Sequence, residues 1–463
     1  MPSELKSVHF IGVCGTAMAA VASALRARNV NVTGSDQNAY PPMSTFLSDC
    51  GIDVRTGYRE ENLPPNPDLV VIGNAISRGN PEAEAVLERR IPYCSLPELL
   101  KSEFIRGKRS IVITGTHGKT TTTSLMAWVF EKNGRDPSYL IGGLPTNFGN
   151  GARFTGSDWF IAEGDEYDTA FFDKRSKFVH YLPEIAIINN IEFDHADIFE
   201  HLGAVQASFR QFVNLIPRNG LLLANGDDPN ITAVIERAFA PVARFGFGPN
   251  SDIRAVDLDV AGDCSKFTVD KTRFQVALPG ELNVRNALAV VACARHCGLD
   301  DAQIQTAFDT FQGIRRRMEI RGTVREITVI DDFGHHPTAV RETLRALRTR
   351  FPGRRLWAIF EPRSNTTRRN VFQEALVEAF SGADQVVIAQ VARLELLPES
   401  QRLDPERLIR EIRSAGPGAE YLPDVESIVE HVGRLAQPGD VVCVFSNGGF
   451  GDIHTKLLER LAG

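Results

Sequence analysis

The sequence lacks the features that would assign it to a membrane or to export. None of its apolar runs reaches the roughly 18 residues that a membrane-spanning helix needs. The first residues, Met1 to Lys6, lead directly into an apolar segment and do not have the zones of a signal peptide. We therefore expect a cytoplasmic protein without a membrane span.

A basic surplus and a cysteine framework are also missing. The formal net charge is −7, whereas proteins that bind nucleic-acid phosphates usually carry a basic surface, so we expect no nucleic-acid partner. The seven cysteines are scattered and odd in number, which fits buried reduced thiols. Cys293 and Cys297 share a helical face, but no further cysteine or histidine stands at ligand spacing, so a metal site there is disfavoured.

The dinucleotide-binding fingerprint is present only in part. A strand, a turn from Gly12 to Gly15 and an alanine-rich helix form a Rossmann-type opening, and Asp36 stands where it could bond a ribose hydroxyl. Phe10 occupies the place of the first glycine of GxGxxG, which disfavours nicotinamide binding. Asn74 follows a later apolar strand, Leu69 to Ile72. Asp36 and Asn74 are therefore either ligand residues or residues that cap helices and form turns.

A phosphate-binding loop stands near residue 115. The apolar run Ser110 to Thr114 ends in Gly115-Thr116-His117-Gly118-Lys119-Thr120, and a helical pattern follows. Glycines let backbone N–H groups approach phosphate oxygens, and the helix N-terminus adds a positive dipole. Lys119 supplies a mobile charge, and the Thr120 hydroxyl can bind Mg²⁺. This order predicts a polyphosphate site.

Two further apolar strands deliver carboxylates and a histidine. Trp159 to Ala162 precedes Glu163-Gly164-Asp165-Glu166, and Ile185 to Ile188 precedes the segment that contains Asn190, Asp194 and His195. The carboxyl ends of parallel strands meet at one edge of a sheet, so these groups should lie beside the phosphate loop. We therefore predict a metal or substrate role for them.

The length and the pattern of elements predict an α/β protein of about three domains. Strands alternate with helices from end to end, apart from a predicted antiparallel hairpin at Lys266 to Val269 and Arg273 to Val276. We place the domains at residues 1–108, 109–317 and 318–463. The first and third are expected to be Rossmann-like, and the second to be a phosphate-loop sheet with added hairpins.

The third domain also has unusual loops after its predicted strands. Asp331-Asp332-Phe333-Gly334-His335-His336-Pro337, Glu361 to Thr366 and Ser446 to Gly451 should face one ligand edge of a doubly wound sheet. The arginines of the junction Gly313 to Glu319 form either a solvated surface or a charge clamp that acts on domain closure.

Taken in order, these motifs resemble the Mur ligase family across essentially the whole chain. The resemblance rests on the phosphate loop, on Glu163 to Glu166, on Asn190 to His195, on Gly313 to Glu319 and on Asp331 to Pro337. Four segments are similar to the members that attach a tripeptide: Tyr40 to Thr45, Asp165 to His180, Glu361 to Thr366 and Ser446 to Gly451.

The resemblance implies an ATP-dependent amide ligase of peptidoglycan recycling that uses Mg²⁺. Its substrates would be UDP-N-acetylmuramate, through the lactyl carboxylate, and the murein tripeptide L-alanyl-γ-D-glutamyl-meso-diaminopimelate, through its free amine. The reaction would pass through an acyl phosphate. We expect a monomer or a weak homo-oligomer.

The resemblance also implies the residues of each site. The ATP-binding residues would be Gly115, Thr116, His117, Gly118, Lys119, Thr120, Thr121, Asn190 at the adenine, Arg317 at the phosphates and Asp332 at the ribose. Lys119, Glu163, His195 and Arg317 would be catalytic, and Thr120, Glu163 and His195 would bind metal. The UDP-sugar would contact Gly12, Gly15, Thr16, Ser35, Asp36, Asn74, Ala75, Asp165 and Glu166. The peptide would contact Arg363, Ser364, Asn365, Thr366, Ser446, Asn447 and Gly448.

The sequence departs from the family pattern at two places. Gly164 stands where alanine is usual, and no lysine follows His195 closely, where several members carry a carbamoylated one. The second departure resembles the members that add L-alanine. It leaves open which group balances the charge of a second metal ion.

Three other functions compete with the tripeptide ligase. An L-alanine-adding ligase would have the same fold and a smaller acceptor pocket. An oxidoreductase would need the first turn to bind a dinucleotide, which Phe10 disfavours. A nucleotide-gated binding module would need only the phosphate loop, and the acidic and histidine loops beside it disfavour that function. The base that accepts the proton of the amine is open among Asp332, His335 and His336.

Overall fold

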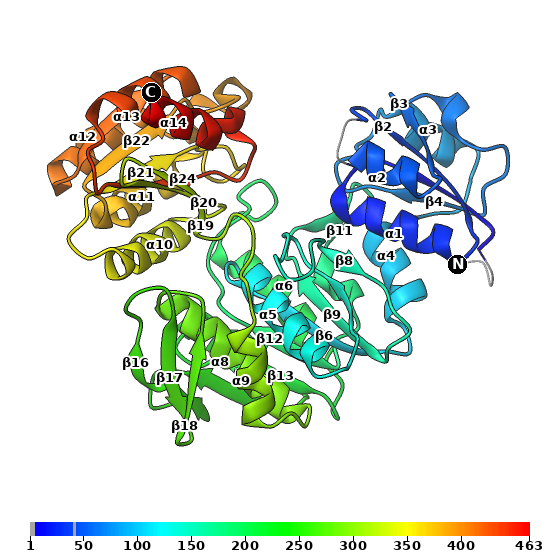
Figure 1. The fold of residues 1–463 in the computed structure, drawn as a ribbon. Coiled ribbons are helices and arrows are strands. Elements are labelled where there is room, and N and C mark those ends of the chain that lie inside the picture. Colours follow the sequence, from blue (N-terminus) through cyan, green and yellow to red (C-terminus); the bar gives the residue numbers. More distant parts are fainter. Residues whose placement is uncertain (1–4, 40–42) are drawn as a thin grey trace.

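The computed structural model describes residues 5–39 and 43–463, which form three lobes (Figure 1). The N-terminal lobe and the C-terminal lobe lie on opposite sides of a central lobe, which runs from cyan to green in the figure. Residues 40–42, which belong to one of the segments that resemble the family, lie outside the described residues. Within the described ranges, no helix has the length and apolar character to cross a membrane.

The N-terminal lobe is a parallel sheet of five strands in the order β3-β2-β1-β4-β5. Every residue of β4 is buried, because helices cover both faces of a parallel sheet and its inner strands become continuous apolar runs. The strands are β1 (Ser7–Ile11), β2 (Asn31–Asp36), β3 (Asp53–Thr56), β4 (Leu69–Ile72) and β5 (Tyr93–Ser95). The helices are α1 (Thr16–Ala27), α2 (Met43–Asp49), η1 (Glu60–Asn62), α3 (Pro81–Glu88), α4 (Leu96–Leu100) and η2 (Lys101–Ile105).

The central lobe has an eight-stranded sheet in the order β15-β14-β13-β12-β6-β9-β7-β8, in which only the β7–β8 pair is antiparallel. The strands are β6 (Arg109–Thr114), β7 (Ser138–Leu140), β8 (Ala152–Arg153), β9 (Trp159–Gly164), β12 (Ile185–Ile188), β13 (Leu221–Asn225), β14 (Val242–Gly246) and β15 (Ile253–Arg254). The helices are α5 (Lys119–Lys132), η3 (Lys177–His180), α6 (Leu202–Val213), α7 (Pro229–Ile235), α8 (Glu281–His296) and α9 (Asp301–Asp309). Because β6 lies between β12 and β9, the three strand ends with the predicted motifs are neighbours.

Two small antiparallel sheets complete the central lobe. One pairs β10 (Asp168–Ala170) with β11 (Asp173–Ser176). The other joins β16 (Val256–Asp259), β17 (Ser265–Val269) and β18 (Thr272–Val276). Phe267 pairs with Phe274 across β17 and β18, so the predicted hairpin is confirmed.

The C-terminal lobe is a six-stranded sheet in the order β19-β20-β24-β21-β22-β23, with only β19 antiparallel to its neighbour. The strands are β19 (Glu319–Val324), β20 (Ile327–Asp332), β21 (Leu356–Phe360), β22 (Gln385–Ala389), β23 (Gly418–Leu422) and β24 (Val441–Phe445). The helices are α10 (Pro337–Arg350), η4 (Asn370–Phe372), α11 (Gln373–Ala379), η5 (Phe380–Gly382), η6 (Leu394–Leu396), η7 (Glu399–Gln401), α12 (Pro405–Ala415), α13 (Val425–Leu435), η8 (Phe450–Asp452) and α14 (Ile453–Ala462). The expected α/β class with two Rossmann-like sheets around a phosphate-loop sheet is confirmed.

The lobes are joined unequally. One hydrophobic core runs without interruption from the N-terminal sheet through Leu99 and Phe104 to Val112 and Phe160 of the central sheet. The ring of Phe104 lies 4.3 Å from that of Phe154, measured between centroids. The C-terminal sheet has two core clusters of its own, one on each face.

Candidate active site

A cavity of about 920 Å³ opens where the three lobes meet. Its wall includes Gly15, Thr16 and Asp36 of the N-terminal lobe, Thr116 to Thr120, Glu163, Asp165 and His195 of the central lobe, and Phe333 to His336 of the C-terminal lobe. Residues that are far apart in the sequence therefore share one site.

The phosphate loop depends on two glycines. Gly115 and Gly118 have φ angles of 138° and 79°, in the region that side chains disfavour. A Cβ atom at Gly118 would also lie 2.6 Å from Asn286 Oδ1. Thr121 is buried in the first turn of α5 and does not belong to the described cavity wall.

Lys119 is held by its own loop and by an acid. Its Nζ donates to the Gly115 carbonyl at 2.6 Å and to Glu166 Oε2 at 2.8 Å. Burial opposes the positive charge, but Glu166 and Asp165 outweigh that effect and raise the pKa of Lys119. Lys119 is therefore a charged group at the cavity wall.

Glu163, Thr120 and Arg317 meet on the other side of the loop. Thr120 Oγ1 donates to Glu163 Oε1 at 3.0 Å, and Arg317 Nη2 donates to Thr120 Oγ1 at 3.2 Å. The backbone N–H of Gly142 donates to Glu163 Oε2 at 2.7 Å. Burial raises the pKa of Glu163. The structure thus brings together three of the predicted residues.

His195 lies in a second acidic group, with Asp165 and Glu166. One ligand atom from each of these residues lies within 4.8 Å of the others. Burial lowers the pKa of His195, but Glu166 and the neighbouring acids raise it to about 9 overall. Glu166 Oε1 lies 3.3 Å from His195 Nε2. Of the two acids expected at the UDP-sugar, Asp165 lines the cavity, and Glu166 accepts from the phosphate-loop lysine.

The predicted residues of the N-terminal lobe are only partly at the cavity. Gly15, Thr16 and Asp36 line it. Ser35 is fully buried and its hydroxyl donates to Glu82 at 2.5 Å, so its side chain does not line the described cavity wall. Asn74 Nδ2 donates to the Asp168 carbonyl at 2.7 Å and so ties the N-terminal lobe to the central lobe. Gly12, Asn74 and Ala75 do not belong to the described wall.

The predicted adenine and ribose residues are engaged within the protein. Asn190 Oδ1 accepts from the backbone N–H of His117 at 2.9 Å, and its Nδ2 donates to the His117 carbonyl at 3.0 Å. Asp332 accepts from the backbone N–H groups of Met318 and Gly334 at 2.9 and 2.7 Å. Burial raises the pKa of Asp332. These contacts fix the phosphate loop and the junction between the second and third lobes.

The predicted peptide loops lie together at the carboxyl ends of β21 and β24. Arg363 is half exposed and lies so close to Gly448 that a Cβ atom there would be 2.5 Å from Arg363 Nη1. Ser446 Oγ donates to Glu361 Oε2 at 2.5 Å. The neighbouring Asn365 and Thr366 contact the central lobe instead, through Asp197 at 2.7 Å and the backbone N–H of Ala196 at 3.2 Å. Ser364 bonds Thr367 Oγ1 within its own loop, at 2.9 Å.

Several wall residues were not singled out from the sequence. Gly142 and Gly143 pack against Glu163 and Thr120, and Lys177 Nζ lies 2.7 Å from Asp165 Oδ2. The guanidinium groups of Arg316 and Arg317 lie over the ring of Phe333, at 5.1 and 5.3 Å from its centroid. The Gly-Gly pair that follows β7 after Ile141 is a signal that could have identified the first of these features.

The fold and the site define a phosphate-loop enzyme whose three domains close around one cavity. Three family descriptions match in succession: "Mur ligase family, catalytic domain" at residues 7–108, "Mur ligase middle domain" at 113–294 and "Mur ligase, glutamate ligase domain" at 316–448. The chain belongs to the Mur ligase family, and it is an ATP-dependent ligase that forms a carbon–nitrogen bond.

Individual relatives cover the whole chain. A UDP-N-acetylmuramate–L-alanyl-γ-D-glutamyl-meso-2,6-diaminoheptandioate ligase of Escherichia coli is 41% identical over 98% of both chains. A UDP-N-acetylmuramate–L-alanine ligase of Psychrobacter cryohalolentis is 35% identical over 98% of this chain and 94% of its own. The crystal structure of a murein peptide ligase from Psychrobacter arcticus matches with a TM-score of 0.73 and 36% identity over 98% of each chain.

Proposed function

We propose that the protein joins the lactyl carboxylate of UDP-N-acetylmuramate to the free amine of L-alanyl-γ-D-glutamyl-meso-diaminopimelate, with ATP converted to ADP and phosphate. The observation that carries this proposal is the 41% identity, over nearly all of both chains, to a ligase named for these substrates. The reaction would return peptide to cell-wall synthesis in the cytoplasm.

The cavity suits the activation that this reaction needs. A carboxylate resists attack by an amine because it is negatively charged, so ATP must first convert it to an acyl phosphate. Lys119 and Arg317, which both line the cavity beside Thr120, would neutralise charge on the transferred phosphoryl group. Asp36, on the wall of the N-terminal lobe, would bond the ribose of the UDP-sugar.

The acidic groups at the cavity fit magnesium ions. Mg²⁺ prefers oxygen ligands, and Thr120 and Glu163 offer a hydroxyl and a carboxylate that already touch. Glu166 Oε1 is buried, and His195 Nε2, 3.3 Å away, is its ion-pair partner; together with Asp165 these groups suit a cation. When bound, Mg²⁺ would withdraw charge from the phosphate oxygens. Asp165 and Glu166 would then supply the negative charge that a carbamoylated lysine supplies elsewhere in the family.

The C-terminal loops suit a peptide with several carboxylates. Arg363 is exposed beside Gly448, and an arginine can bond both oxygens of a carboxylate. Asn447 Oδ1 is buried without a hydrogen-bond partner among the described residues, so it is available to accept from the peptide. These groups would hold the tripeptide beyond its reacting amine.

His335 is the base that the contacts favour. Asp332 already accepts from the backbone N–H groups of Met318 and Gly334. Both ring nitrogens of His336 are also engaged, by the Phe193 carbonyl and by the backbone N–H of Thr338. His335 lines the cavity, and its Nδ1 donates to the Phe333 carbonyl at 3.3 Å, so Nε2, which lies 3.7 Å from Asp194 Oδ2, carries the lone pair.

A ligation assay with UDP-N-acetylmuramate, Mg²⁺ and ATP tests this function. The purified protein would be incubated with the tripeptide or with L-alanine, and the products would be identified by mass spectrometry. We expect the UDP-linked tripeptide. Efficient ligation of L-alanine with no tripeptide product would instead support the second candidate function, which the 35% identity to an L-alanine ligase keeps open. We expect the active protein to be a monomer or a weak homo-oligomer.

A further inference from the structure

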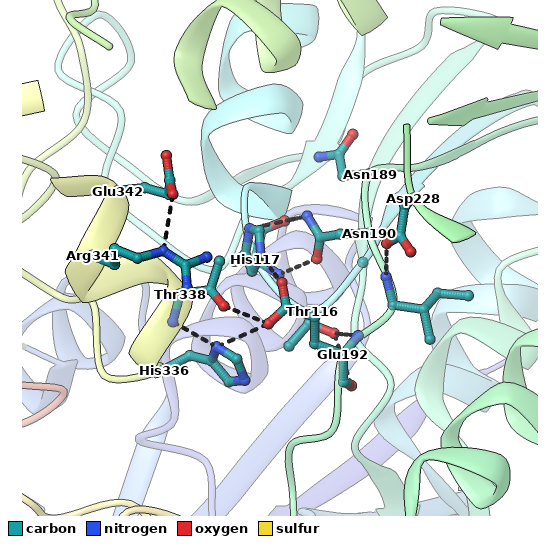
Figure 2. Close-up of polar contacts among 12 residues, drawn as sticks. Thr116, His117, Asn189, Asn190, Glu192, Asp228, His336, Thr338, Arg341 and Glu342 are labelled. Carbon is teal, nitrogen blue, oxygen red and sulfur yellow. Dashed lines mark hydrogen bonds and ion pairs between the residues drawn. The ribbon is translucent and has the colours of Figure 1, made fainter. Parts of the chain in front are cut away.

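Glu192, in the loop after β12, connects the phosphate loop to the C-terminal lobe (Figure 2). On the central side, its Oε1 lies 2.9 Å from His117 Nε2, and its backbone N–H donates to Thr116 Oγ1 at 2.8 Å. On the C-terminal side, its Oε2 lies 2.6 Å from the hydroxyl of Thr338, in the first turn of α10. One carboxylate is thus shared by two lobes.

The proton positions on the central side follow from the contacts of His117. The Asn190 side-chain oxygen accepts from a backbone N–H, so its amide nitrogen is the donor that faces His117 Nδ1 at 3.0 Å. His117 Nδ1 is therefore an acceptor, and Nε2 carries the proton that is donated to Glu192. Glu192 consequently fixes both Thr116 and His117, which are next to each other in the phosphate loop.

On the C-terminal side, Thr338 is the donor that crosses between the lobes. His336 Nδ1 accepts from the backbone N–H of Thr338 at 3.3 Å, and Nε2 donates to the Phe193 carbonyl at 3.2 Å. The His336 ring therefore presents a lone pair to Glu192, 3.5 Å away, and makes no ion pair with it. Burial opposes ionisation of Glu192, but the hydrogen bonds from His117 and Thr338 help to outweigh it, and the pKa falls to about 2. The carboxylate is ionised and accepts from both sides.

We propose that Glu192 is a positioning residue that couples docking of the C-terminal lobe to nucleotide binding at the phosphate loop. When α10 is docked, Thr338 orients the carboxylate, and the carboxylate orients His117 two residues before Lys119. Coupling between two equilibria is reciprocal, so bound nucleotide also favours the docked lobe. The proposal requires ATP use and does not depend on which amine the enzyme accepts.

The test is the affinity of the full-length protein for a non-hydrolysable ATP analogue with Mg²⁺, measured by calorimetry. Thr338→Val keeps the shape of the side chain and removes only the hydroxyl. We expect it to weaken the affinity by about five- to tenfold, the lower range of allosteric couplings, although Thr338 is not part of the described cavity wall. Thr338→Ser should restore the wild-type affinity. In a Glu192→Gln background, Thr338→Val should have little further effect, because the link is already broken.

Glu342→Gln is the matched control. Glu342 is another carboxylate of α10, but its ion pairs with Arg341 and Arg345 stay within that helix (Figure 2). The affinity of the Glu342→Gln variant for the ATP analogue should equal that of the wild type. The proposal is overturned if Thr338→Val leaves the affinity unchanged, or if it lowers the affinity equally with Glu192 and with Gln at position 192. A purely structural role of Thr338 would lower the melting temperature without changing nucleotide affinity.

Discussion

Lys119 shows how a single side chain can serve two purposes. Its ammonium group is the counter-charge of the buried Glu166 carboxylate, and it also faces the cavity. An exposed loop lysine would contribute little to stability, but the Lys119 side chain is largely buried. Removing it would leave Glu166 without its lysine partner.

We expect Lys119→Ala to lower the ligation rate by about 10² to 10³, the usual effect of deleting one preorganised donor. The melting temperature should also fall, because an unpaired buried carboxylate destabilises the folded state. Steady-state rates, corrected for the folded fraction by circular dichroism, measure both effects. A variant that keeps half of the wild-type rate would contradict the assignment of the phosphate loop.

Arg363→Ala tests the peptide site. We expect the KM for the tripeptide to rise by about tenfold with little change in the KM for ATP, the pattern of lost binding to one substrate. Arg407→Ala is the matched control, because Arg407 lies on α12 and pairs with Glu411 one turn along the same helix. Equal KM values for the tripeptide in the wild type and in Arg363→Ala would remove Arg363 from the acceptor site.

Glu82 predicts a pH dependence of stability in the N-terminal lobe. This buried carboxylate accepts from Ser35, His9, Asn62 and the backbone N–H of Arg59. Burial opposes its ionisation, but these hydrogen bonds outweigh burial and lower its pKa in the folded protein. A lowered folded-state pKa stabilises the protein above the unfolded pKa of about 4.5, and that stability is lost as the pH falls through the folded value.

Glu82→Gln should therefore cost about 2 kcal/mol of unfolding free energy at pH 7 and progressively less below pH 4.5. Urea unfolding at several pH values measures this, and a constant difference down to pH 2 would contradict it.

Among the elements, the inner strands were predictable and the edge strands were not. Strands such as Leu69–Ile72 and Val441–Phe445 are buried on both faces, so they appear in the sequence as unbroken apolar runs. The edge strands Glu319–Val324 and Gly418–Leu422 have few buried residues and no comparable signal. Helix α8 begins at Glu281, directly after Gly280, whose φ of 95° lies in the region that side chains disfavour.

The loop after β7 leads to a prediction about how closely it packs against the phosphate loop. A Cβ atom at Gly143 would lie 2.7 Å from Thr120 Cγ2, so this loop can approach the phosphate loop only without a side chain. We expect Gly143→Ala to displace Thr120 and to raise the KM for Mg²⁺–ATP several-fold, on the order of 1 kcal/mol of lost binding. Gly156→Ala is the control, because a Cβ atom there meets no atom within 4 Å. An unchanged KM for Mg²⁺–ATP in Gly143→Ala would show that the loop after β7 can move away from the phosphate loop without weakening nucleotide binding.

At the scale of the whole molecule, the sequence indicated which loops share an edge but not which side chains meet. Glu163 and Thr120 were predictable as neighbours because Glu163 lies at the carboxyl end of β9 and Thr120 follows the adjacent parallel strand β6. The contacts of Glu192 with Thr338, and of Asn365 with Asp197, join lobes whose relative placement no periodicity encodes.

The unequal joining of the lobes has a consequence for heat denaturation. The N-terminal and central sheets share one apolar core through Phe104, so neither can lose its packing without exposing the core of the other. The C-terminal sheet keeps separate clusters and meets its neighbours through polar contacts such as Glu192–Thr338. Differential scanning calorimetry should therefore resolve two transitions. Three transitions would contradict the shared core, and a single transition would contradict separate melting of the C-terminal lobe. The three lobes would then unfold as two cooperative units. Saturating nucleotide should bring the melting temperatures of these two units closer together.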